Sequence, residues 1–202
     1  MKPGSICIAA ALAAGFMTAA AAGAQPAKDP DWPCIQVLVP ALSPGQLWAG
    51  PPIDEADATW AQDPRIASLR ERATGRAVKP DAIENDVQAL AKEAGPDKDK
   101  ALTALFAGVF ETMDSRRAKE IAAIKRYARQ QREIQAEIAA TLHELDGAPK
   151  DSPEAARITD RLTLLRRVLD ERRRSLTAVC DLPVETERRL GEMARVIAAY
   201  LE

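Results

Sequence analysis

Few groups in this sequence could carry out chemistry, and none forms a familiar catalytic set. His143 is the only histidine, and Asp146, three residues later, is the one carboxylate expected on its helical face. A catalytic zinc site needs three protein ligands, so we expect His143 to be an ordinary solvent-exposed side chain. The sequence also lacks a Gly-x-Ser-x-Gly elbow, a glycine-rich phosphate loop and a Cys-x-x-Cys-His haem motif. We therefore predict a protein that is not an enzyme, with no catalytic residue, cofactor or metal.

The first 24 residues have the pattern of a cleavable secretory signal. Lys2 provides the positive start, residues 6–16 are apolar, and Ala22, Gly23 and Ala24 form a small-residue cleavage site. We expect cleavage near Ala24 and export to the periplasm. Residues 1–24 are therefore left out of the predicted fold.

Two cysteines remain after Cys7 of the signal is removed, namely Cys34 and Cys180. Two cysteines in an exported protein usually pair, because that compartment is oxidising. We predict a Cys34–Cys180 disulfide, which would tie the N-terminal segment to a helix end near Ile121. The alternative is two free thiols or bridges between molecules.

A long stretch predicts two antiparallel helices folded into a hairpin. The first arm runs from Lys98 to Asp146 without an internal proline, residues 147–151 break the helix, and a second arm follows Pro153. Both arms carry apolar side chains at steps of three and four residues, the spacing of a heptad seam. Folded antiparallel, the arms pair positions whose numbers sum to about 300, so that Leu142 meets Ile158. The predicted seams contain Ile121, Ile124, Ala128, Gln131, Gln135, Ile138, Leu142 and Leu145 in the first arm, and Ile158, Leu162, Leu165, Leu169, Arg172, Leu176 and Val179 in the second. We expect the head of Arg172 to stay in water.

The fold class that follows is all-α, with a small helical head, a projecting hairpin over residues 114–180 and an N-terminal strap. Residues 25–62 are rich in proline and tryptophan and predict an extended strap, with a short strand conceivable over 35–39. Residues 63–202 form the helical domain. It begins with a helix from Asp63 to Gly75 and another from Pro80 to Gly95, and a separate C-terminal helix is expected after Pro183.

Charge placement is the one functional signal. Residues 25–202 hold 27 basic and 30 acidic side chains, which gives no reason to expect a nucleic-acid partner. Residues 116–132, however, contain seven basic side chains against Glu120 alone, and the predicted register brings further arginines alongside. Such a face can attract an acidic protein or anionic lipid headgroups, whereas arginines paired with neighbouring carboxylates would make it only a solvated surface. The candidate partner-binding residues are Arg126, Arg129, Arg132, Arg166, Arg167 and Arg173.

Several motifs resemble an uncharacterised family of exported helical proteins from Gram-negative bacteria. They are residues 31–34 (DWPC), 48–52 (WAGPP), 105–112 (LFAGVFET) and 175–180 (SLTAVC). That family has no known activity, so the resemblance implies a compartment and a fold but no mechanism. Our first hypothesis is a non-enzymatic periplasmic adaptor that presents the basic hairpin to a protein partner or envelope complex. The alternative is a chaperone-like binder of unfolded clients, and the hairpins could also pair between two copies of the chain.

Overall fold

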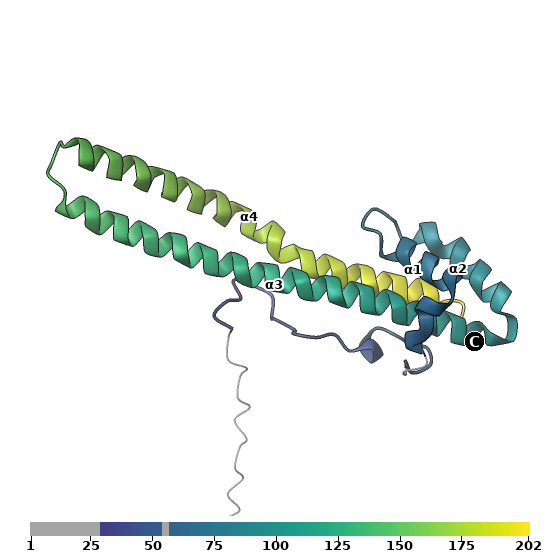
Figure 1. The fold of residues 1–202 in the computed structure, drawn as a ribbon. Helices are drawn as coiled ribbons and strands as arrows, with labels where there is room; N and C mark the ends of the chain where they lie inside the picture. Colours follow the sequence, from purple (N-terminus) through teal and green to yellow (C-terminus); the bar gives the residue numbers. More distant parts are fainter. Residues whose placement is uncertain (1–28, 54–56) are drawn as a thin grey trace, which may run out of the picture.

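The computed structural model describes residues 29–53 and 57–202, and its architecture is all-α with a projecting hairpin (Figure 1). Four α-helices follow one another, α1 (Pro64–Thr74), α2 (Asp81–Ala94), α3 (Lys98–Gly147) and α4 (Pro153–Ala198). Three short 3-10 helices, η1 (Pro44–Gln46), η2 (Asp57–Gln62) and η3 (Gly95–Asp97), lie in the connecting segments. The predicted signal sequence, residues 1–24, lies outside the described residues.

The head is held by one hydrophobic cluster at the base of the hairpin. The first turns of α3 bury a broad apolar face formed by Leu102, Leu105, Phe106, Val109 and Met113. Helices α1 and α2 and the last turns of α4 pack around that face, through Ile66, Leu69, Ile83, Val87, Leu90, Leu190, Met193 and Ile197. Since each of these helices is amphipathic, their apolar faces share one core.

The ends of the short helices follow the predicted signals. Asp63 is the N-cap of α1, where its carboxylate accepts a hydrogen bond from the Arg65 amide at 2.9 Å, and Pro64 occupies the first turn. Gly75 follows the last residue of α1, and Gly95, at φ 55°, follows α2. At the hairpin tip, the Ser152 hydroxyl caps α4 by accepting a bond from the Ala155 amide at 3.0 Å.

The prediction of a separate C-terminal helix after Pro183 was wrong, because α4 continues through this proline to Ala198. Proline inside a helix removes one backbone hydrogen bond and crowds the preceding turn. Pro183 is buried, and it lines a small hollow between α4 and the strap with Trp32 and Leu38. Burial of the ring in this contact region accounts for a helix that continues where the sequence signal predicts a break.

The arms pair antiparallel near the predicted register. The Tyr127 hydroxyl donates to the Arg172 carbonyl at 2.8 Å, and these two numbers add to 299. The seam of the second arm is confirmed, since all seven predicted positions are buried or half-buried. In the first arm two positions were wrong: Gln135 and Leu142 are exposed, and Ile134 and Thr141 occupy the seam instead.

Two local contacts explain how polar side chains enter the seam. The Thr141 hydroxyl donates to the Glu137 carbonyl at 2.7 Å, so burial leaves it with a hydrogen-bond partner. Arg172 is half-buried, and its hydrogen bond across the arms is exposed. Its guanidinium lies 4.1 Å from the centre of the Tyr127 ring and donates to the Gln130 amide oxygen at 2.9 Å.

Candidate interaction surface

The strap lies along α3 (Figure 1) and is tied to α4 by the predicted disulfide. The Cys34 and Cys180 sulfur atoms are 2.02 Å apart and join residues separated by 146 positions. Both cysteines are buried in a second hydrophobic cluster with Trp32, Ile121 and Ile124. The bridge therefore closes beside Ile121, where the sequence predicted it.

The tryptophans anchor the strap and η2 to α3. The Trp32 indole N–H donates to the Gln36 carbonyl at 2.7 Å, which folds the segment around Cys34. Trp48 stacks on Phe106 with ring centres 4.3 Å apart, and the Trp60 indole N–H donates to Glu111 at 3.0 Å. No strand forms over 35–39 or elsewhere in the part of the chain that the structure describes.

Two aspartates at the start of the described strap pair with basic residues of α3. The Asp29 carboxylate lies 2.8 Å from the Lys125 ammonium group. Asp31 pairs with Arg129 at 2.6 Å and also with Arg132, whose second guanidinium nitrogen donates to the Pro30 carbonyl at 3.1 Å. Part of the basic face thus serves to dock the strap.

These ion pairs also lower the pKa of both carboxyl groups. The hydrogen bond from Lys125 holds the pKa of Asp29 below its ordinary value. Hydrogen bonds from Arg129 and then Arg132 do the same for the pKa of Asp31. Because ionised carboxylates bind arginine best, strap docking is strongest above pH 4.

Of the six predicted partner-binding arginines, four have ion-pair partners within the chain. Besides Arg129 and Arg132, Arg167 pairs with Glu171 at 3.2 Å, and Arg173 lies 3.7 Å from Asp170. Arg126 and Arg166 are exposed and make no ion pair with another described residue. The basic face that remains available is therefore smaller than the sequence suggests.

A deeply buried arginine, which sequence reasoning did not single out, joins three elements. The Arg117 side chain is 3% exposed, its Nε lies 2.5 Å from Glu187 of α4, and its Nη2 donates to the Val39 carbonyl at 2.5 Å. It therefore connects α3, α4 and the strap in one contact. An arginine within a basic run gives no sequence signal of this role.

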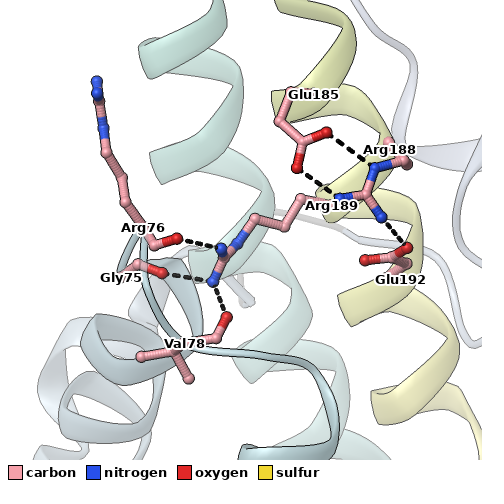
Figure 2. A network of polar contacts seen from close by, with 7 residues as sticks. All are labelled: Gly75, Arg76, Val78, Glu185, Arg188, Arg189 and Glu192. Carbon is pink, nitrogen blue, oxygen red and sulfur yellow. Dashed lines mark hydrogen bonds and ion pairs between the residues drawn. The ribbon is translucent and has the colours of Figure 1, made fainter. Parts of the chain in front are cut away.

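Arg189 fixes the loop between α1 and α2 to α4 (Figure 2). Its guanidinium donates to the Arg76 carbonyl at 2.6 Å and to the carbonyls of Gly75 and Val78. Burial, followed by the nearby charge of Arg116, lowers the pKa of Arg189. Next to it, Arg188 lies between Glu185 and Glu192 and pairs with both (Figure 2).

Among residues 29–53 and 57–202, no three His, Cys, Asp or Glu side chains lie close enough together to hold a metal ion. His143 is exposed near the end of α3. No helix within those ranges is both long and apolar enough to cross a membrane.

No family model, curated protein or solved structure matches this chain. The resemblance to a family of exported helical proteins therefore stays a prediction. Function has to be argued from the surfaces of this chain itself.

Proposed function

We propose that the protein is a non-enzymatic periplasmic interaction protein whose hairpin contacts a protein partner. The observation that carries this proposal is the isolation of the distal hairpin. Both hydrophobic clusters and the strap pairs involve α3 only up to Arg132 and α4 only from Leu176 onward. Between those points, the described hydrogen bonds and ion pairs join one arm to the other or stay within one arm, as between Arg161 and Glu137.

The distal arms also leave apolar surface uncovered. Leu164 is 62% exposed and Leu142 is 36% exposed, while the seam residues Ile138 and Leu165 are only half-buried. Two helices cannot cover all sides of their own seam, and a partner would gain by burying what remains. A long arm without other contacts also has no evident role in stabilising the head.

Two arginines left on the arms would suit an acidic patch on the partner. Arg126 and Arg166 remain unpaired among described residues, and each is exposed. Rim charges of this kind direct association and set its salt dependence more than its final affinity. Anionic lipid headgroups offer the same charge but would use less of the exposed leucine surface.

The proposed compartment rests on the predicted signal and agrees with the disulfide. Disulfides persist in the periplasm and are rare in the reducing cytosol. A bridge between Cys34 and Cys180 would stay closed there and hold the strap to α4.

Crosslinking in intact cells tests this proposal directly. A photoreactive residue at Leu142 or Leu164 should capture a distinct partner protein. The same residue at Ala77, an exposed head position, should not capture that partner. Recovering only crosslinks between copies of the chain would replace the adaptor role with self-association.

Charge reversal separates the proposed binding mode from its alternatives. The double substitution Arg126→Glu with Arg166→Glu should reduce capture, and higher salt should weaken it because exposed charges are screened. The matched control, Lys79→Glu with Arg195→Glu, changes the same charge on the exposed surface of the head. Capture that resists salt and ignores both reversals would favour the chaperone-like role. Binding to anionic vesicles without a captured protein would favour a lipid surface.

A further inference from the structure

The strap exposes three β-branched side chains in alternation. Ile35 is fully exposed, Val37 is 81% exposed and Val39 is 45% exposed, whereas Gln36 and Leu38 between them are half-buried. Leu38 packs against the cluster around the disulfide. Beyond the bend at residues 34–36, this alternation is the pattern of an extended chain with one covered side. Here the apolar branched residues are on the uncovered side, which marks this segment as an interaction surface.

The backbone of this segment has unused hydrogen-bonding groups. The N–H groups of residues 35–39 donate no hydrogen bond to another described residue. Two carbonyls are occupied, since Gln36 accepts from the Trp32 indole and Val39 accepts from Arg117. Residues 34–36 form a bend, but the extended residues 37–39 with free N–H groups resemble the edge strand of a sheet, which can pair with another chain.

The same contacts preset the shape of the segment. The disulfide holds it at Cys34, the Gln36 side chain donates to the Cys180 carbonyl at 2.6 Å, and Arg117 holds Val39. A binding segment fixed before its partner arrives loses less conformational entropy on association.

A small hollow adjoins the exposed side chains. It has a volume of about 90 Å³ and is lined by residues that include Val37, Val39, Pro183 and Val184. At about 30 Å³ per water molecule, this space would hold about three waters, which is close to the size of one branched aliphatic side chain. Val184, which is 47% exposed, extends the apolar surface onto α4.

We propose that residues 35–39, together with Val184, bind an extended, uncharged segment of another polypeptide. The ligand backbone pairs with the free N–H groups of the strap, and one aliphatic ligand side chain fills the hollow. This combination of main-chain pairing and side-chain sockets is how proteins recognise strands at an edge. The site is separate from the charged hairpin, and its test does not depend on the proposed adaptor role.

Two observations select an extended peptide over other ligands. A helical ligand has its own main-chain groups paired and cannot use the free N–H groups of the strap. Residues 32–53 contain no charged side chain, and Arg117 beside the hollow already pairs with Glu187, so lipid headgroups find no counter-charge there.

The test uses the full chain with its disulfide intact and an end-blocked, dye-labelled peptide of alternating valine and threonine. Fluorescence anisotropy should show saturable binding that is unchanged between about 50 mM and about 500 mM salt, because no charge pair contributes. Val37→Asp should weaken binding by about tenfold or more. The matched control, Leu182→Asp, changes an exposed residue of α4 that lines a different hollow with Arg116, and it should bind normally.

Methylated peptides separate main-chain pairing from general stickiness. Methyl groups on the amide nitrogens along one edge of the peptide should abolish binding, and those along the other edge should leave it intact. Equal binding of both peptides, or normal binding by Val37→Asp, would overturn the proposal. Dimerisation that Val37→Asp abolishes, without any peptide binding, would instead show that the strap pairs with a second copy. Both variants must keep the helical circular dichroism and the closed disulfide of the parent protein.

Discussion

Arg117 has more structural consequence than any other basic residue of the hairpin. It is almost wholly buried, yet its guanidinium has a partner on α4 and another on the strap. Removing one member of a buried charged contact leaves the others without partners, which usually costs more than the contact contributes. Arg129 and Arg132 of the same run are exposed, and their ion pairs are worth much less.

Substitution of Arg117 by methionine should lower the free energy of unfolding by about 2–4 kcal/mol, because the Val39 carbonyl and Glu187 lose their partner. Urea unfolding followed by circular dichroism would measure this loss. Arg126→Met is the matched control, since Arg126 is exposed and has no ion pair among described residues; its change should stay within about 0.5 kcal/mol. Equal effects of the two substitutions would contradict the assigned role of Arg117.

Asp63 should make stability depend on pH in the acid range. Its hydrogen bond from the Arg65 side chain, and next that from the Arg65 amide, lower its pKa from 3.8 to about 2. A carboxyl group with a lowered folded-state pKa contributes stability above its unfolded value, and this is lost as pH falls from about 4 to about 2. Asp63→Asn keeps a good N-cap but cannot titrate.

The difference in unfolding free energy between the parent protein and Asp63→Asn should therefore shrink over that pH range. Denaturant titrations at pH 6, 4 and 2 would measure it. A difference that is constant with pH would show that the charge of Asp63 contributes nothing.

The individual elements show what the sequence could and could not predict. Local signals sufficed for α1, where Asp63, Pro64 and Gly75 mark its ends, and heptad spacing sufficed for the hairpin and its register. Local signals misplaced the break at Pro183, because burial of the proline ring depends on tertiary contacts. The seam position of α3 is Thr141 and not the predicted Leu142. A heptad pattern favours the leucine, but the buried threonine hydroxyl has a hydrogen-bond partner in the Glu137 carbonyl.

The candidate site was less predictable than the fold. The sequence indicated the basic run and the cysteine pair, but it did not indicate that Asp31 forms ion pairs with Arg129 and Arg132. Those residues are about 100 positions apart, and no local rule relates them. The exposure of Ile35 and Val37 could not be predicted either, because apolar side chains in such a segment are ordinarily expected to be buried.

Gly108 allows α3 to pack closely against η2. A Cβ atom at this position would lie 2.8 Å from the Trp60 ring, too close for a rigid indole to accommodate without moving. Alanine favours a helix over glycine by about 1 kcal/mol. We nevertheless expect Gly108→Ala to destabilise the protein by about 1–2 kcal/mol, since overpacking exceeds this gain.

Thermal unfolding would test the effect of Gly108→Ala, and tryptophan fluorescence would report movement of Trp60. Gly147→Ala, at the last residue of α3, is the control because a Cβ atom there meets nothing within 4 Å. A stabilised Gly108→Ala variant with unchanged fluorescence would show that the close packing has no energetic consequence.

In the molecule as a whole, the stabilising contacts are concentrated at one end. The main core joins α1, α2 and the root of the hairpin, and the second cluster lies just beyond it around the disulfide. The distal arms extend away from both (Figure 1). The root of α3 and α4 thus carries the contacts that stabilise the fold, and the distal parts of the same two helices project from it.

Replacing residues 135–165 with a short glycine and asparagine turn should leave the head folded. Both ends of this deletion lie on the predicted register, so the shortened arms can still meet. We expect the disulfide to form and the thermal midpoint to fall by less than about 5 °C, because both clusters remain. Circular dichroism and a free-thiol assay would test this, and loss of cooperative unfolding would show that the arms support the head.

The position of the two bridged cysteines also sets an order of events during synthesis. Cys34 leaves the ribosome 146 residues before Cys180, and more than half of α4 lies between the hairpin tip and the second sulfur. A chain is synthesised at about 5–20 residues per second, so the first thiol is made on the order of ten seconds before the second. The earliest segment of the described chain to be made is thus among the last to be secured.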